Sequence, residues 1–402
     1  MRCRLRGMKN PRALVIGGGI AGPAMSVFLA RSGIEPAVFE AYPRSESAGG
    51  GFQIAPNGLR VLGEVGVAER VIEAGTPSRD FVFRNHRGKT IGVIRTATAG
   101  IAVNIARASL HRILRTEVER VGIPIHYGMR LRGIETRGQK VVATFADGSK
   151  EEADLLVGAD GIHSRVRGLL LPDHARSRDT RMIALGGFCP RGFVLPVEPA
   201  EADRLTFIVG PRHQFGYSKM SGQWGWWCHV AFDTDEEKRM LLGMSDEELR
   251  ARMLERYRGW CAPSDELIRT TESWLRTPIH DVPSLPVWHR GQVVLIGDAA
   301  HAMSPAGGQG ASLALEDSML LGKLLADRSR SFEESFARFE SLRKKRAEAM
   351  VAQGYANDRR SLKELGRFGL WMRDTMLMPM LSRIMAKALG RVYAGDPALR
   401  SA

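Results

Sequence analysis

The 402-residue sequence predicts an α/β fold, and three segments far apart in the chain lead to that prediction. Each segment is an apolar run, typical of a buried strand, followed by a turn that contains glycine. The three segments are Ala13 to Gly22, Val157 to Gly161 and Val294 to His301. Because strand–turn–helix units of this kind build open parallel sheets, the segments together predict one Rossmann-like domain assembled from separated parts of the chain.

The first segment has the spacing G-x-G-x-x-G, formed by Gly17, Gly19 and Gly22, between a strand and a helix over residues 20–31. The first glycine permits a tight turn, the second lets the backbone approach a pyrophosphate, and the third lets the helix pack closely. The helix N-terminus would meet the diphosphate with free N–H groups. A second strand ends at Glu40, where an acidic residue binds ribose hydroxyls. The segment predicts a dinucleotide site; the alternative is a structural turn.

The second and third segments each place an aspartate at the end of an apolar run. They contain Asp160-Gly161 and Gly297-Asp298. A carboxylate there can accept hydrogen bonds from sugar hydroxyls, and the glycine leaves room for a ligand against the backbone. Taken alone, each aspartate is better explained as a helix N-cap.

Together the three segments resemble the class A flavoprotein monooxygenases, the family typified by para-hydroxybenzoate hydroxylase, from about residue 12 to about residue 345. The resemblance implies FAD as cofactor, NAD(P)H as transient reductant and O₂ as co-substrate. It also implies a single-component enzyme in which a C4a-hydroperoxyflavin hydroxylates or epoxidises an aromatic or polycyclic small molecule. The cofactor-binding residues implied are Gly17, Gly19, Ile20, Ala21, Gly22, Glu40, Arg107, Asp160, Gly161, Gly297, Asp298, Pro305, Gly308, Gln309 and Gly310.

A charge argument supports a flavin-ring site at residues 304–310 independently. The glycines after Pro305 lead into a helix-like stretch over residues 311–325, so several N–H groups face the turn. Reduced flavin is an anion, and a helix N-terminus stabilises such charge by roughly 0.3–2 kcal/mol. The alternative is a loop that caps the helix and binds nothing.

Two other functions use the same cofactor site. One is an FAD-dependent reductase or desaturase that inserts no oxygen, which isotopic oxygen in the product would distinguish. The other is a non-catalytic flavin-binding protein, which would leave the run Pro305 to Gly310 without a chemical role. The sequence has no HExxH or CxxC motif, so no metal is expected. It also has no GxSxG motif of a serine nucleophile. A single GxGxxG motif indicates that the nicotinamide cofactor has no Rossmann domain of its own.

The predicted organisation is interleaved. We expect a disordered leader over residues 1–11, in which Met8 is an alternative start, and a discontinuous FAD-binding domain over 12–75, 100–178 and 279–345. A β-sheet substrate domain is inserted over 76–99 and 179–280, and a C-terminal helical segment occupies 346–402. Strands of the inserted domain are expected at 81–83, 91–94, 181–188, 205–209 and 226–232.

Candidate substrate residues lie on these strands, where alternate side chains face the same way. The substrate pocket is predicted to include Phe215, Trp226 and Cys228, or else the face that carries Trp227 and His229. The catalytic candidates are His229, His213 and Tyr217. A histidine beside a phenol could act as a general base, because its pKa is near neutral and a phenolate accepts oxygen more readily. We expect His301 to support its turn instead.

Composition is that of an ordinary globular protein, with 44% hydrophobic and 25% charged residues. Four scattered cysteines (Cys3, Cys189, Cys228 and Cys261) show no metal or disulfide spacing, so we expect reduced thiols and a cytoplasmic enzyme, monomeric or homodimeric. The net charge of +14 suits anionic NAD(P)H and acidic substrates. Its basic residues are dispersed, so no nucleic-acid partner is expected. No apolar stretch reaches the roughly 20 residues needed to cross a bilayer, so stable membrane insertion is not expected.

The C-terminal segment is rich in methionine. Met372, Met376, Met378, Met380 and Met385 surround Trp371. Such residues can line a hydrophobic pocket, a membrane-surface face or a partner groove. We expect ordinary packing against the body of the protein, and Pro379 should interrupt any helix there.

Overall fold

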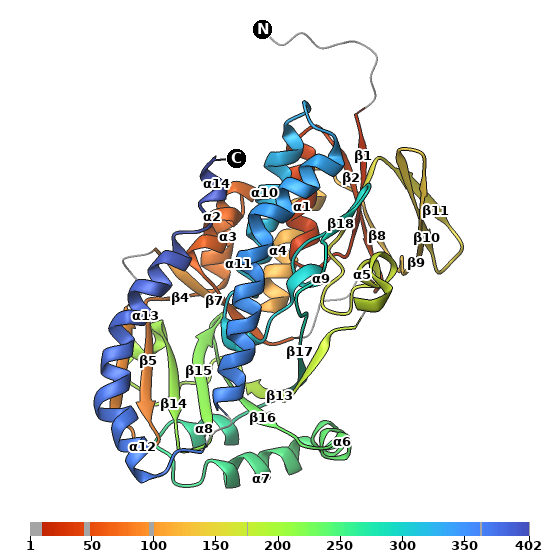
Figure 1. Cartoon of the computed structure of the whole chain (residues 1–402). Helices are drawn as coiled ribbons and strands as arrows, with labels where there is room; N and C mark the ends of the chain where they lie inside the picture. The colour runs from red at the N-terminus through yellow and green to blue at the C-terminus, as the bar shows by residue number, and fades with distance from the viewer. Residues whose placement is uncertain (1–9, 44–48, 96–99, 175, 362–363, 402) are drawn as a thin grey trace.

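A computed structural model describes residues 10–43, 49–95, 100–174, 176–361 and 364–401. Up to residue 9, including Met8 and Cys3, the expected leader lies outside this range. Two large sheets dominate the architecture, and a long C-terminal helix runs beside both (Figure 1). Within the described residues, no helix is long and apolar enough to cross a membrane.

The first sheet has six strands. All are parallel except the edge strand β18, which pairs antiparallel with its neighbour. In spatial order they are β18 (His289–Arg290), β19 (Val293–Leu295), β12 (Leu155–Gly158), β1 (Arg12–Ile16), β2 (Glu35–Glu40) and β8 (Ile125–Tyr127). Packed helices include α1 (Ala21–Arg31), α4 (Arg107–Arg120) and α10 (Gly310–Ala326). The neighbouring strands β19, β12 and β1 are largely buried apolar runs, as a parallel sheet with helices on its faces requires.

Smaller elements complete this half of the molecule. One three-stranded sheet consists of β11 (Lys150–Ala153), β10 (Lys140–Phe145) and β9 (Leu131–Arg137). Another consists of β3 (Gly51–Ile54), β7 (Ala102–Ala106) and β4 (Thr76–Ser78). The remaining helices here are α2 (Pro56–Val65), α3 (Ala68–Ala74), α5 (Arg165–Leu170) and the 3₁₀ turn η2 (Pro172–His174).

The second large sheet has seven strands. In spatial order they are β17 (Ser273–Asp281), β13 (Arg178–Phe188), β16 (Gln223–Ala231), β15 (Gln214–Met220), β14 (Arg204–Val209), β5 (Asp80–Asn85) and β6 (Thr90–Arg95). The additional helices of this half are η3 (Pro199–Asp203), α6 (Asp235–Gly243), α7 (Asp246–Arg256) and α8 (Ser264–Arg269). The last two lie at the lower end of the view in Figure 1 and bury one face of the sheet. The five expected strands are all present, and β15 and β17 are two further strands that the sequence analysis missed.

The C-terminal part is helical. Its elements are α11 (Phe332–Ser361), α12 (Arg367–Met372), the π-helical turn η5 (Arg373–Leu377), α13 (Met378–Tyr393) and α14 (Ala398–Ser401). The boundary expected between residues 345 and 346 falls inside the continuous helix α11. Pro379 does not end the helical run, because it lies in the first turn of α13, directly after the π-helical turn η5.

Candidate flavin site

The three predicted turns lie side by side at the carboxyl ends of neighbouring strands in the six-stranded sheet. Strand β1 pairs in parallel with β12, and β12 with β19, so Ile16, Gly158 and Leu295 are in register. The N–H of Ala159 donates to the carbonyl of Ile16 at 2.8 Å, and that of Ile296 to Gly158 at 3.0 Å. The carboxyl ends of parallel strands are where open α/β sheets bind ligands, so the three turns form one candidate site.

The first turn fits a diphosphate. A Cβ on Gly22 would collide with the carbonyl oxygen of Gly17, whereas one on Gly19 would meet nothing within 4 Å. Gly17 has φ +108°, which only glycine adopts easily, and a Cβ there would strike the backbone of Ala159. Helix α1 has neither a side-chain cap nor an acidic residue in its first turn. Its first N–H groups therefore face the open space beside Gly19, as an anion site requires.

Glu40 stands beside this turn, where the ribose would lie. Its Oε2 accepts from the N–H of Gly18 at 2.7 Å and its Oε1 from the N–H of Tyr42 at 2.9 Å. The carboxylate is thus held in one orientation, with further lone pairs for sugar hydroxyls. On the other side of the turn, Nε2 of His111 lies 2.7 Å from the carbonyl oxygen of Gly18 and anchors it to α4.

Asp160, in the second turn, binds the start of helix α5, whose N-cap residue is Ser164. Its Oδ1 accepts from the hydroxyl of Ser164 at 2.5 Å, and its Oδ2 accepts from the N–H groups of Arg165 and Val166 at 2.7 and 3.0 Å. Its contact with FAD or the nicotinamide cofactor stays a prediction. Gly161 adopts φ +79° with open space at its Cβ position. The fully buried Arg167 then joins the second turn to the third, because it donates to the carbonyl of Ala299 at 2.9 Å.

The third turn presents an exposed carboxylate on a rigid base. Gly297 has φ +57°, and its N–H donates to Oδ2 of Asp317 at 2.9 Å. Asp298, the first residue of α9 (Asp298–His301), is exposed, and its Oδ1 lies 3.9 Å from the Cβ position of Gly310 at the start of α10. A carboxylate in this place is available to a ribityl chain. His301 supports the turn through Nε2, 2.6 Å from Asp317.

Asp317 is buried between His301 and Arg343. Burial raises its pKa, but the neighbouring His301 and Arg343 outweigh that effect and hold the pKa of Asp317 at about 2. Arg343, also fully buried, donates from Nε to Oδ1 of Asp317 at 2.8 Å. The carboxylate of Asp317 at the base of the third turn is therefore ionised at any physiological pH.

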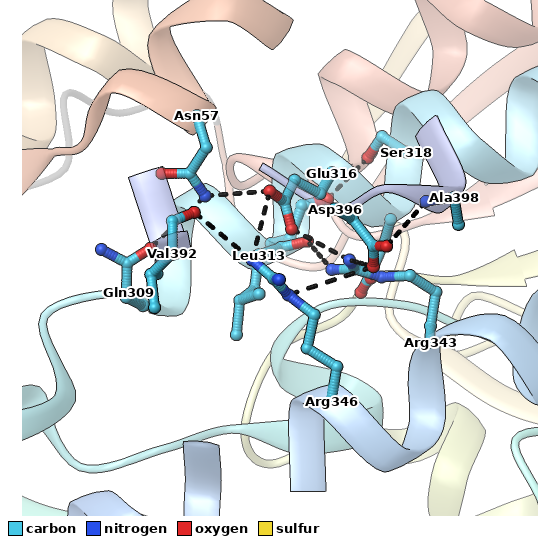
Figure 2. A network of polar contacts seen from close by, with 12 residues as sticks. Asn57, Gln309, Leu313, Glu316, Ser318, Arg343, Arg346, Val392, Asp396 and Ala398 are labelled. Atoms are coloured by element: carbon cyan, nitrogen blue, oxygen red, sulfur yellow. Dashed lines mark hydrogen bonds and ion pairs between the residues drawn. The ribbon is translucent and has the colours of Figure 1, made fainter. Parts of the chain in front are cut away.

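Figure 2 shows that this network extends to the C-terminal segment and to the predicted ring site. Nη1 of Arg343 donates to Glu316 at 2.9 Å and to Asp396 at 2.6 Å. Asn57, on α2, donates to Oε1 of Glu316 at 3.0 Å and to Oε1 of Gln309 at 3.4 Å. The sequence analysis missed these residues. Arg343 belongs to the basic run 343–346 on α11, and the available signal was the pair of acidic residues in the otherwise apolar helix α10.

The ring-side run forms the 3₁₀ turn η4 (Pro305–Gly307) and then the start of α10. Gly308 is left-handed, with φ +61°, and the Gln309 N-cap makes no side-chain cap. No acidic residue lies in the first turn of α10, so its N–H groups can face an anion. Arg107 is exposed at the first position of α4, with Cδ 3.4 Å from the Cβ position of Gly49. Residues 44–48 of this loop lie outside the described range.

Several predicted substrate residues lie on the helix-covered face of the seven-stranded sheet. Phe215, Trp226, Cys228 and Tyr217 are at most 2% exposed and belong to one core with side chains of α7 and α8. The hydroxyl of Tyr217 donates to Glu201 at 3.0 Å, and burial together with this carboxylate raises the tyrosine's pKa. These four side chains are therefore part of a packed core.

His213 lies on the same side of the molecule. Its Nδ1 is 2.8 Å from Nη2 of Arg256, and burial together with this arginine lowers the pKa of His213 to about 4. It is neutral at pH 7 and a weak base.

The opposite face of the sheet meets the flavin half. Cδ1 of Leu275 lies 3.4 Å from the Cβ position of Gly50, and a Cβ on Gly51 would collide with Sδ of Met220. Three half-buried aromatic rings line this face. Phe83 stacks on Phe207 with centroids 5.3 Å apart, and Phe207 meets Trp227 edge-on at 5.8 Å. Register pairing places them in one row across four strands.

His229 shares this face with Trp227. Its Nδ1 lies 3.6 Å from Oδ1 of Asp358 on α11, and both side chains are almost fully buried. The alternation of β16 thus separates the predicted alternatives, since Trp226 and Cys228 point to the helices, and Trp227 and His229 point to the other side. Among the described residues, no cluster of His, Cys, Asp and Glu is suited to a metal ion.

Comparison with known proteins shows the family to which the chain belongs. The FAD binding domain family model matches residues 11–354. The aurachin C monooxygenase/isomerase of Stigmatella aurantiaca is 30% identical over 92% of this chain and 94% of its own length. The 6-hydroxynicotinate 3-monooxygenase of Pseudomonas fluorescens is 29% identical over 84% and 89%. The structure of Klebsiella pneumoniae HpxO, complexed with FAD and uric acid, has the same fold, with a TM-score of 0.83, 24% identity and coverage of 96% and 97%.

The matching family model, the relatives' activities and the three glycine turns agree on one conclusion. The chain belongs to the FAD binding domain family and is a class A, single-component FAD-dependent monooxygenase.

Proposed function

We propose that the enzyme hydroxylates an electron-rich aromatic ring that binds between the flavin site and the sheet face bearing Trp227. The observation that carries the proposal is the row formed by Phe83, Phe207 and Trp227, which faces the flavin half. Flat apolar rings offer stacking and edge contacts to an aromatic substrate. The relatives named for 6-hydroxynicotinate and aurachin C support a ring substrate.

The chain's own residues would hold the cofactor at three places. The N-terminus of α1 would bind the diphosphate, Glu40 the ribose and Asp298 the ribityl chain. When bound, FAD supplies the redox chemistry, accepting a hydride from NAD(P)H and activating O₂ for transfer to the substrate. The free N–H groups at the start of α10 would stabilise negative charge beside them.

His229 is our candidate for the group that takes a proton from a substrate hydroxyl. Asp358, 3.6 Å from its Nδ1, would orient the imidazole and stabilise the cation that proton uptake produces. Deprotonation makes the ring carbon a better acceptor of electrophilic oxygen. The surrounding burial excludes water, which protects the reactive oxygen species from side reactions.

We also propose that the enzyme works in the cytoplasm as a monomer or homodimer, where NAD(P)H is available as a transient reductant. The free thiols of Cys189, Cys228 and Cys261 are compatible with that compartment. The net charge of +14 favours encounter with an anionic nicotinamide cofactor.

The test is NAD(P)H oxidation by the FAD-loaded protein in ¹⁸O₂, with and without a panel of phenols, hydroxypyridines and quinolones. We expect one compound class to accelerate oxidation and to gain one ¹⁸O atom. Accelerated oxidation with an unlabelled, desaturated product would contradict oxygen insertion. Asp298→Ala serves as the matched control, because it should bind FAD more weakly and should therefore oxidise NAD(P)H more slowly when FAD is limiting.

A further inference from the structure

The C-terminal helices carry an exposed apolar face that the flavin site does not use. Contrary to the packing we expected for this segment, its large apolar side chains point into solvent. Their exposed fractions are 73% for Phe368, 55% for Trp371, 59% for Met376, 53% for Met380, 57% for Ile384 and 42% for Met385. The rings of Phe368 and Trp371 stack with centroids 5.9 Å apart. Contiguous exposed apolar side chains of this kind mark an interaction site.

The face lies along an outer edge of the molecule. Helix α13 packs on the edge strand β6, where Gly92 meets the backbone of Met378 and the side chain of Ser382. Figure 1 shows α12 and α13 following one another along that side, with their other face outward. At 1.5 Å per residue, residues 367–393 extend over roughly 40 Å.

Basic side chains are interleaved with the apolar ones. The stretch 367–393 has five basic residues and one acidic residue, Asp374, whose carboxylate pairs with Arg373 at 2.7 Å. Arg383, Lys387 and Arg391 are exposed. Within α13, at 3.6 residues per turn, positions 380, 383, 384, 387 and 391 share one side, so the cations lie within the apolar face and not opposite it.

This mixture decides which partner fits. A groove on another protein would have to desolvate the cations together with the apolar groups. A second copy in an isologous dimer would set the same Arg383 and Lys387 against each other. At a bilayer interface, by contrast, apolar side chains enter the acyl boundary, aromatic rings sit at the headgroups, and Lys and Arg side chains reach anionic phosphates.

We propose that α12 and α13 dock the enzyme on the surface of an anionic lipid bilayer. The helices lie in the plane of the interface without crossing it. Phe368, Trp371, Met380 and Ile384 enter the headgroup region, and Arg383 and Lys387 bind lipid phosphates.

The test is co-sedimentation of the FAD-loaded full chain with vesicles of phosphatidylcholine and phosphatidylglycerol, compared with phosphatidylcholine alone. We expect binding to the anionic vesicles that weakens with salt. The double variant Arg383→Gln/Lys387→Gln should bind about 25-fold more weakly, because each basic residue near an anionic surface contributes about fivefold. Met380→Ser/Ile384→Ser should lose about tenfold or more, because two large side chains no longer leave water.

Matched control variants make the same kinds of substitution outside α12 and α13. Arg252→Gln/Lys345→Gln removes two exposed charges on α7 and α11, and Val194→Ser removes an apolar side chain that is 81% exposed. Both should bind vesicles like the unaltered enzyme, and all variants should keep their FAD. Brominated acyl chains should quench Trp371, and Trp371→Phe should abolish that quenching.

Three results would overturn the proposal. One is failure to sediment with the anionic vesicles. Another is equal weakening by the control variants, which would mean that only the total charge matters. The third is a dimer in sedimentation velocity that Met380→Ser/Ile384→Ser dissociates while vesicle binding is unchanged, because a second copy would then cover the face.

Discussion

Replacing Arg343 by Met should destabilise the enzyme strongly, although this side chain is fully buried and not exposed to a ligand. The guanidinium is fully buried among Asp317, Glu316 and Asp396, which are themselves at most 7% exposed. Removing one partner of such a buried network typically costs about 3–5 kcal/mol, because the remaining charges lack compensation. For 402 residues the unfolding entropy is about 0.84 kcal/mol per kelvin, so the melting temperature should fall by about 4 to 6 °C.

The pH dependence of this loss has a defined sign. Asp317 has a pKa of about 2 in the folded protein, against an ordinary value of 3.8 for an aspartate. Its ionisation therefore contributes stability, about 2 kcal/mol, that is fully present above pH 4 and is lost as the pH falls through 2. Since Arg343 supplies part of that shift, the gap in melting temperature between the variant and the unaltered enzyme should narrow as the pH falls from 4 towards 2.

The assay is thermal unfolding followed by intrinsic fluorescence at a fixed scan rate. Arg330→Met is the matched control, because Arg330 pairs with Asp327 at 2.8 Å on the surface, with side chains 50% and 41% exposed. Exposed pairs contribute about 0–1 kcal/mol, so its melting temperature should change by about 1 °C or less. A decrease of the same small size for Arg343→Met would refute the argument that the buried network supports the third turn.

Three further predictions concern the site. Asp298→Ala should weaken FAD binding by about 10- to 100-fold, the value of one hydrogen bond to a charged group, and equilibrium dialysis that shows unchanged affinity would contradict the ribityl assignment. His229→Phe should slow oxygen transfer to a phenolic substrate while sparing FAD content, whereas unchanged single-turnover rates would exclude His229 as the base. His213 should titrate near pH 4 by NMR, and Arg256→Ala should move that pKa towards 6.5, because the arginine charge contributes to the depression; a free titration near 6.5 in the unaltered enzyme would disprove its burial.

The sequence predicted the local chemistry of the turns well, because that chemistry lies in residues a few positions apart. Gly17, Gly19 and Gly22 are spaced by the geometry of one strand and one helix, so their steric roles follow from the spacing alone. The sharing of one sheet edge by three distant turns was also foreseeable, since each ends a buried apolar run. Asp160 shows the limit, because a ligand contact and a helix cap require the same residue at the same place.

The sequence was less informative about which face of a strand packs against the helices. Strand alternation divides β16 into two sets of side chains, but nothing in a strand's own sequence says which set meets the helices. Trp226 and Cys228 were therefore as good candidates as Trp227 and His229 until α7 and α8 were placed. Strand β15 escaped detection because Gly216 interrupts its apolar alternation; the structure shows that the ring of Trp227 occupies the space a side chain there would need.

The buried charges explain why the C-terminal segment belongs to the cofactor site although it contributes no motif. Asp317 accepts a hydrogen bond from the N–H of Gly297. Arg343 in turn donates to Asp317 and to Asp396. On the same segment, the hydroxyl of Tyr393 donates to Gln53 at 3.2 Å. A displacement of α13 at the surface should therefore be transmitted through these hydrogen bonds to the third turn. Docking on a bilayer and FAD affinity should then be thermodynamically coupled, so vesicles that bind the enzyme should change its FAD dissociation constant, and FAD should change vesicle affinity by the same factor.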